Sequence, residues 1–377
     1  MAQHPSPANL PASAGQADPT GLTLSTLPLI PVGSPEARAC LEGVTHVYTD
    51  LDGTLFAPGG RLLASHAGEP STATAEALVA CKRTGIEVII VTGRNGMQGN
   101  ELLRILDLDT FIGELGCLRM DGFGAKARIS YELGDWEHAV LDSGLAPGVL
   151  PEGVTPYQLI ERSGVLDRLT AAFPGRLEVH RPYPGERMVT HPLRGNVDGE
   201  KVVRLLADEA LPLTLLDNGQ IHPQTHTLVD CPEIHIYHLM PRGASKALAV
   251  AHDIALRGLA PERTLAIGDA RADMEMGEHT GSLVVLANAL PSAAVQEALR
   301  ARAERAERAE QQAGRGGATA TEAVAETGPG RAEPAAATLY TEGSTADGWV
   351  EFAHALLTAK GAGQEGGASG RRPGPLF

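Results

Sequence analysis

The ten residues VYTDLDGTLF, from Val47 to Phe56, place Asp50 and Asp52 at the end of an apolar run and directly before a Gly-Thr turn. The run is typical of a buried strand, and residues two apart on a strand point to the same side. Two carboxylates beside a buried strand are unfavourable unless something compensates their charge. The stretch therefore predicts a site at the carboxyl end of a parallel strand, where open α/β sheets bind their ligands.

Helix-like and strand-like segments alternate on the C-terminal side of this stretch. Helices are expected at about 71–84 and 97–106, and between them the β-branched run IEVIIV, residues 86–91, is typical of a central parallel strand. A short strand is expected in DTFIGELG, residues 109–116. This rhythm predicts an α/β fold with a doubly wound parallel sheet.

The pattern changes between residues 126 and 235. Half-exposed strands such as KARISYEL, residues 126–133, alternate with one helix expected at 155–173 and another at 199–209. Such a mixture predicts a separate α+β domain with an antiparallel sheet. The first rhythm resumes at residue 236, so this domain is inserted into the first one.

The first domain is therefore expected to be discontinuous, from 41–125 and 236–360. A low-complexity insertion interrupts its second part near residues 305–336. Residues 1–40 are rich in Pro, Ala, Ser and Gly and are expected to be disordered, and 361–377 should form a flexible tail.

Composition limits the range of functions. The chain has 377 residues and a net charge of −15, which argues against nucleic acid and anionic membranes as partners. Its four cysteines are scattered, which favours a reducing cytoplasm. No run of apolar residues is long enough to span a membrane, and the N-terminus lacks the pattern of a secretory signal. The oligomeric state is left open.

The two aspartates suit acid–base and covalent chemistry. One carboxylate can act as a nucleophile and a metal ligand, and its neighbour can protonate a leaving group and then activate water. The alternative interpretation is a simple turn, because Asp-Gly-Thr is a common loop sequence.

The motif DLDGTL, residues 50–55, resembles the first motif of the haloacid dehalogenase superfamily of phosphohydrolases. The resemblance extends to three later motifs in the same order. They are VIIVTGR with Thr92, PRGASKALAV with Lys246, and LAIGDARADMEM with Asp269 and Asp273.

This resemblance implies a Rossmann-like core, an aspartyl-phosphate intermediate and Mg²⁺. Asp50 would attack phosphorus, and Asp52 would shuttle the proton. Asp50, Asp269 and the backbone carbonyl of Asp52 would bind the metal, because Mg²⁺ prefers oxygen ligands.

The remaining motif residues would surround the phosphate. Thr92 would bind a phosphate oxygen, and Lys246 would neutralise both the nucleophile and the phosphate. Asp273 would orient water or Lys246 from outside the metal's coordination sphere. Ala272 stands where related proteins often have Asn, so one hydrogen bond of the family site is absent or replaced.

The inserted domain resembles the type 2 cap of this superfamily, whose members mostly act on sugar phosphates and other small organophosphates. The basic stretch HRPYPGERMVTHPLRGNVDG, residues 180–199, provides the candidate substrate-binding residues Arg187, His191 and Arg194, with Arg181 beside them. The alternative is that these are solvated strand residues. His235 and His238 are three residues apart, which places them on opposite faces of a strand and argues against a shared zinc site.

The leading hypothesis is therefore a cytoplasmic Mg²⁺-dependent phosphatase of a small phosphorylated metabolite, such as a sugar or polyol phosphate. A phosphotransferase or phosphohexomutase would share the same motifs. A regulatory protein without turnover is a third possibility, although all five motif residues that chemistry needs are present.

Overall fold

The computed structural model describes residues 27–136, 154–180, 187–316 and 337–361. The larger of its two sheets has nine strands in the order β1–β13–β12–β11–β2–β3–β4–β5–β6. The strands are β1 (Ile30–Pro31), β2 (His46–Thr49), β3 (Glu87–Val91), β4 (Thr110–Gly113), β5 (Leu118–Asp121), β6 (Arg128–Tyr131), β11 (Thr264–Gly268), β12 (Ser282–Val285) and β13 (Ala337–Tyr340).

The strands from β1 to β4 in this order pair in parallel, whereas β5 and β6 extend the sheet in antiparallel fashion. Hydrophobic side chains alternate between the two faces of the central strands, so both faces are buried. Helices α1 (Pro35–Leu41), α2 (Ala73–Arg83), α3 (Gly96–Leu106) and α11 (Thr345–Ala359) cover one face, and α8 (Lys246–Arg257), α9 (Arg271–Met276) and α10 (Ala293–Gly316) cover the other. The predicted doubly wound α/β fold is confirmed.

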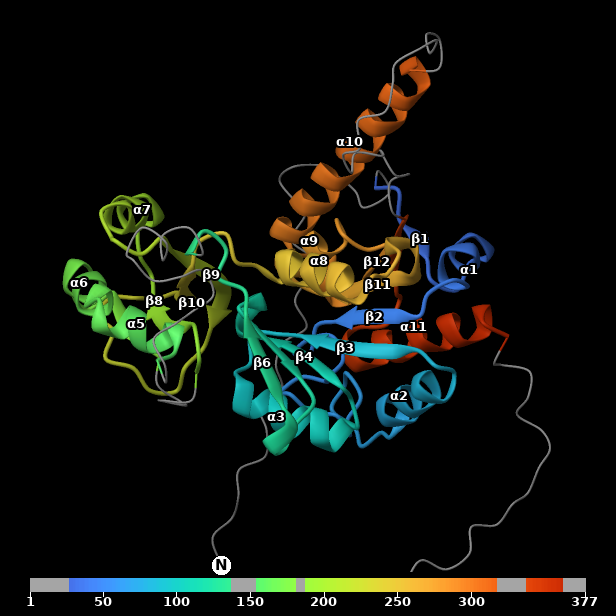
Figure 1. Cartoon of the computed structure of the whole chain (residues 1–377), viewed down its shortest axis with the longest axis horizontal. Helices are drawn as coiled ribbons and strands as arrows, with labels where there is room; N and C mark the ends of the chain where they lie inside the picture. Colours follow the sequence, from blue (N-terminus) through green and yellow to red (C-terminus); the bar gives the residue numbers. More distant parts are fainter. Residues whose placement is uncertain (1–26, 137–153, 181–186, 317–336, 362–377) are drawn as a thin grey trace, which may run out of the picture.

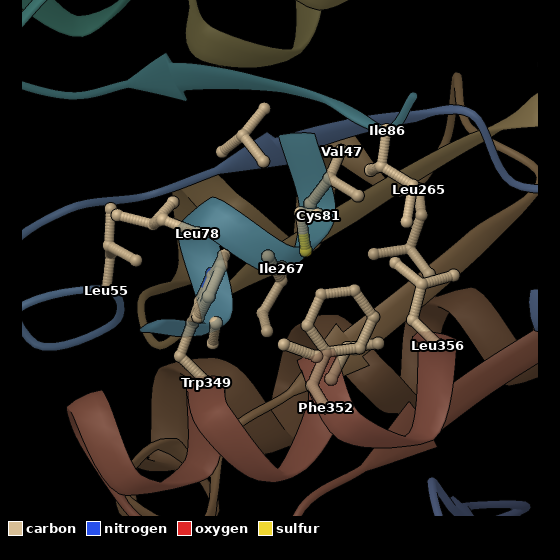
Figure 2. Close-up of a cluster of buried hydrophobic side chains, with 14 of the residues drawn as sticks. Val47, Leu55, Leu78, Cys81, Ile86, Leu265, Ile267, Trp349, Phe352 and Leu356 are labelled. Atoms are coloured by element: carbon tan, nitrogen blue, oxygen red, sulfur yellow. The ribbon is translucent and has the colours of Figure 1, made fainter. Parts of the chain in front are cut away.

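Helix α11, the C-terminal helix of the described residues, contributes buried side chains to the main hydrophobic core. Its Trp349, Phe352 and Leu356 are fully buried and lie against Leu78 and Cys81 of α2 (Figure 2). The indole Nε1 of Trp349 also donates a hydrogen bond to Thr49 Oγ1, at the end of β2. The C-terminal segment therefore supports the strand that leads into Asp50.

The second sheet has four antiparallel strands in the order β7–β8–β10–β9. They are β7 (Leu177–Val179), β8 (His191–Gly195), β9 (Leu213–Ile221) and β10 (Ile234–Pro241). One face packs against helices α5 (Pro156–Arg162), α6 (Val165–Ala172) and α7 (Gly199–Ala207) through a separate hydrophobic core. This is the predicted α+β domain, called the cap below, and it lies beside the larger sheet (Figure 1).

The boundaries predicted for the cap are wrong by one strand at each end. β6 (Arg128–Tyr131) was assigned to the cap but pairs with β5 in the main sheet, because the β5–β6 hairpin continues the main sheet's edge. β10 begins at Ile234 and pairs with β8 and β9, so it belongs to the cap sheet. The single helix expected at 155–173 is two helices, because Gly164 has a φ of 73° that no α-helix can contain.

The expectation of disorder for residues 1–40 is wrong for its last part. β1 pairs with β13. Ser34 is the N-cap of α1, and its side chain accepts a hydrogen bond from Ala37 N–H. Val32, Ala37 and Leu41 are buried in the main core, so these residues have apolar partners despite the polar composition before them.

Helix α10 extends to Gly316 and so includes the start of the predicted low-complexity insertion near residues 305–336. The expectations for residues 1–26, 317–336 and 362–377 lie outside the described residues. No helix within the described ranges is both long and apolar enough to cross a membrane.

Candidate active site

The predicted site residues meet at the carboxyl ends of three neighbouring strands. Asp269, Asp50 and Thr92 directly follow β11, β2 and β3, which lie side by side in the main sheet. Lys246 is the first residue of α8, which begins beyond the cap. This is the edge of a parallel sheet at which α/β proteins bind ligands.

Lys246 joins two of the acids. Its Nζ donates to Asp50 Oδ1 at 2.6 Å and to Asp273 Oδ1 at 2.8 Å. All three side chains are buried, so the ion pairs are screened little by water. Asp273 Oδ2 accepts hydrogen bonds from the backbone N–H groups of Asp269 and Ala270. Asp273 thus holds Lys246 and the turn that carries Asp269 in one arrangement.

The cluster has more negative than positive charge. Burial, together with repulsion from Asp273 and Asp269, raises the pKa of Asp50 to about 7, although Lys246 acts in the opposite direction. Burial and repulsion from Asp273 raise the pKa of Asp269 to about 6. Burial lowers the pKa of Lys246, but attraction to Asp273 and Asp50 outweighs this and leaves the pKa above its usual range.

Asp269 is held by residues that the sequence analysis did not identify. Thr54 Oγ1 donates to its Oδ1 at 3.2 Å, and Asn288 Nδ2 donates to its Oδ2 at 2.9 Å. Gly53 has a φ of 92°, and a Cβ at this position would lie 2.4 Å from Asp269 Oδ2. The Gly-Thr turn after the first aspartates therefore fits around the carboxylate that follows β11.

Asp50, Asp269 and Asp273 each offer a carboxylate oxygen, and these oxygens lie within 4.8 Å of one another. Such a set fits a hard divalent cation, which prefers carboxylate oxygens and would relieve their mutual repulsion. The Asp273 oxygens already accept hydrogen bonds from Lys246 and the backbone, so Asp50 and Asp269 are the better ligands.

Asp52 points to a different partner. Arg94 donates from Nε to Asp52 Oδ2 at 2.8 Å and from Nη2 to Oδ1 at 2.6 Å, a bidentate pair at the mouth of the site. Gly60 lies beneath this pair, since a Cβ there would be 2.7 Å from Arg94 Nη2. Arg94 N–H also donates to the buried Thr92 hydroxyl. Arg94 was missed, although it follows Thr92 by only two residues.

A cavity of about 730 Å³ lies above these residues. Asp50, Asp52, Thr92, Lys246 and Asp269 line it from the core. The cap residues that line it are His180, Arg187, Pro192, Asn218, Ile236 and His238. The cavity is therefore lined by residues of both domains.

Of the three substrate-binding candidates in the cap, only Arg187 lines this cavity. His191 is buried on the other face of the cap sheet, where it stacks on Tyr157 and its Nε2 bonds to the Tyr157 carbonyl oxygen. The guanidinium of Arg194 forms an ion pair with the carboxylate of Glu178 on β7. The candidates His191 and Arg194 therefore do not line this cavity, and Arg181 lies outside the described residues.

Arg187 belongs to a joint between the domains. The carboxylate of Glu114, fully buried after β4, accepts hydrogen bonds from the backbone N–H groups of Met188, Val189 and Thr190. Arg187 Nη2 donates to the Gly93 carbonyl at 2.8 Å, and its Nε lies 3.6 Å from Glu114 Oε2. The cap is thus attached to the loop that follows β3 and to the turn that follows β4.

Fold and site together define an α/β enzyme with a Rossmann-like core, an inserted cap and a buried acid–lysine cluster between them. A family model for haloacid dehalogenase-like hydrolases matches residues 47–120 and 215–299, which contain all the predicted core site residues. The chain belongs to the haloacid dehalogenase-like hydrolases.

Two proteins and one solved structure are similar to this chain. A phosphoglycolate phosphatase from Methanoculleus marisnigri is 26% identical over 244 residues, which cover 64% of this chain and 84% of that protein. An HMP-PP phosphatase from Citrobacter koseri is 27% identical over 257 residues, with the same shares covered. A solved structure from Thermoplasma acidophilum aligns with a TM-score of 0.44 at 18% identity, covering 68% of this chain and 89% of that one.

Proposed function

We propose that this protein is a Mg²⁺-dependent phosphatase that hydrolyses a small phosphorylated metabolite, a sugar or polyol phosphate, through an aspartyl-phosphate on Asp50. The observation that carries the proposal is the position of Asp50. It lies at the base of a cavity between core and cap, with Lys246 Nζ 2.6 Å from its carboxylate.

The residues present fit the metal. Asp50 and Asp269 would hold Mg²⁺, with the backbone carbonyl of Asp52 as a further oxygen ligand. When bound, the cation would screen the carboxylates and allow a phosphate dianion to approach.

In this proposal, Lys246 orients Asp50 and offsets the charge of the incoming phosphate. Thr92 already accepts the Arg94 N–H, so its own hydroxyl proton is directed to a phosphate oxygen. Asp50 attacks phosphorus, the bond from phosphorus to the ester oxygen breaks, and Asp52 donates a proton to the leaving alkoxide. Asp52 then takes a proton from the water that attacks the acyl phosphate, which releases inorganic phosphate and regenerates Asp50.

In this scheme, the guanidinium of Arg94 determines when Asp52 can transfer a proton. Because Arg94 binds both carboxylate oxygens of Asp52, the pair has to open before Asp52 can transfer a proton. An incoming phosphate is a competing bidentate acceptor for the same guanidinium. Substrate binding would therefore release Asp52 when it is needed.

The test is phosphate release from a panel of sugar and polyol phosphates in the presence of Mg²⁺. We expect turnover of at least one ester by the wild type and a loss of about a thousandfold or more in Asp50→Asn. Asp107→Asn is the matched control, because Asp107 is an exposed residue at the end of α3. Full activity in Asp50→Asn would refute the proposed mechanism.

A further inference from the structure

One face of the cap sheet forms a wall of the cavity, and a row of residues crosses it. His180 N–H donates to the Pro192 carbonyl on β8, and Pro192 pairs in register with His238 on β10. Residues directly opposite each other on neighbouring strands project to the same face of a sheet. His180, Pro192 and His238 accordingly all line the cavity.

The two imidazoles of this row lack the partners that buried polar groups normally have. Nδ1 of His180 and Nδ1 of His238 are buried and have no hydrogen-bond partner within the described part of the chain. His238 is only 6% exposed. Buried polar nitrogens are nearly always satisfied, but these two are closed to solvent in the structure. The Nε2 atoms of the same rings are not buried and have no hydrogen-bond partner among the described residues, so they are the atoms that a ligand in the cavity can reach.

We infer that His180 and His238 form a hydrogen-bonding subsite for the hydroxyl groups of a neutral sugar or polyol leaving group. This inference rests on the proposed phosphatase function, in which the cavity holds the phosphate against Asp50. The core binds the phosphate, and the histidine row of the cap selects what the phosphate is attached to.

The electrostatics of the wall favour hydroxyl groups over a second anion. Burial, together with the charge of Arg187 and the neighbouring His180, lowers the pKa of His238 to about 3. Burial and Arg194 lower the pKa of His180 as well. A neutral imidazole has one donor and one acceptor nitrogen, which matches a hydroxyl that donates and accepts, whereas a carboxylate only accepts.

The nearest cation of the wall does not change this preference. Arg187 Nε lies 3.6 Å from the buried carboxylate of Glu114 and donates to Thr190 Oγ1, so its charge is largely compensated within the joint. Ile236 and Pro192 supply apolar surface beside the histidines. Hydroxyl-bearing carbon skeletons present both apolar and hydrogen-bonding surface, as this wall does.

The test compares two phosphate esters, sorbitol 6-phosphate and 4-nitrophenyl phosphate, of which only the first carries alcohol hydroxyls. In His180→Phe and His238→Phe, which keep a planar ring, we expect the ratio of kcat/KM for the first ester to that for the second to fall about tenfold. His235→Gln is the matched control, because His235 lies on the same strand but pairs with Asp217 outside the cavity. An unchanged ratio in both phenylalanine variants would overturn the inference.

Calorimetric binding of sorbitol 6-phosphate to Asp50→Asn separates the subsite from the reaction. We expect the dissociation constant to rise about tenfold when either histidine is also changed to phenylalanine. Unchanged binding would overturn the subsite even if the wild type hydrolyses phosphate esters. Histidine-dependent binding, together with no turnover of any ester of the panel by the wild type, would instead support the subsite and refute the proposed phosphatase.

Discussion

At the residue scale, the site was largely predictable because its members follow strand ends in local motifs. Asp50, Thr92 and Asp269 each directly follow a buried strand, and a parallel sheet brings such positions together. Arg94 and Asn288 were missed, and each lies three residues beyond the last residue of a strand, β3 and β12 respectively. Their partners, Asp52 and Asp269, are far away in sequence, so no local pattern shows which side chain they orient.

The metal proposal gives a residue-scale prediction that needs no turnover. Mg²⁺ should raise the melting temperature of the wild type by several degrees, because ligand at about a hundred times its dissociation constant stabilises by about 2.7 kcal/mol. Asp269→Asn removes one ligand and should abolish most of this rise. Differential scanning fluorimetry with and without Mg²⁺, at matched ionic strength, measures it.

The exposed variant Asp107→Asn serves as the control and should respond to Mg²⁺ like the wild type. A full melting-temperature rise in Asp269→Asn would show that the acids after β2 and β11 do not hold the cation.

At the element scale, the joint between core and cap was not predictable. Glu114 has a φ of 50°, unusual for a residue other than glycine, and its carboxylate binds a segment more than 70 residues further along the chain. No periodicity or propensity signals such a contact. The boundaries of the cap were wrong for a related reason, because the sequence indicates that β6 and β10 are strands but not which sheet each one pairs with.

Glu114→Gln tests the joint. An amide keeps one acceptor oxygen but replaces the other with a donor, so at least one of the buried N–H groups of Met188, Val189 and Thr190 loses its partner. We expect the free energy of unfolding in urea to fall by about 1–3 kcal/mol. Glu101→Gln, at an exposed position on α3, should stay within about 0.5 kcal/mol of the wild type. An equally small effect at Glu114 would contradict the role given to the joint.

At the scale of the whole molecule, the predicted architecture is correct: a discontinuous parallel core carries an inserted antiparallel cap. The repeating pattern of strands and helices is enough to predict this, because each element has to bury its apolar face against another. Residues 30–40 were assigned to a disordered segment because residues 1–40 are rich in Pro, Ala, Ser and Gly. Their order comes from tertiary partners, namely the pairing of β1 with β13 and the packing of α1 in the core.

The buried histidines of the cap predict how stability depends on pH. Burial, opposed by the hydrogen bond to the Tyr157 carbonyl, lowers the pKa of His191 from 6.5 to about 4. As pH falls below 6.5, the unfolded chain binds a proton that the folded protein excludes, so stability is lost until the folded histidine titrates near 4. Burial lowers the pKa of His238 as well, so His238 contributes to the same loss of stability.

From about pH 7 to about pH 5, His191 alone should remove about 2 kcal/mol of stability. Urea unfolding at both pH values measures the loss. His191→Phe, which keeps an aromatic ring against Tyr157, should flatten the slope, and His354→Gln, at an exposed position on α11, should leave it unchanged. The same slope in His191→Phe and wild type would contradict this assignment.

The central claim, that Asp50 becomes phosphorylated, is tested most directly by trapping the intermediate. The wild type and Asp52→Asn are mixed with a ³²P-labelled sugar phosphate and Mg²⁺, quenched in acid, digested and analysed by mass spectrometry. We predict a hydroxylamine-sensitive phosphoryl group on Asp50 in the wild type, absent from Asp50→Asn. In Asp52→Asn the group should form and disappear more slowly, because both proton transfers lose their catalyst. A label on any other residue, or turnover with no covalent label in either protein, would contradict the mechanism.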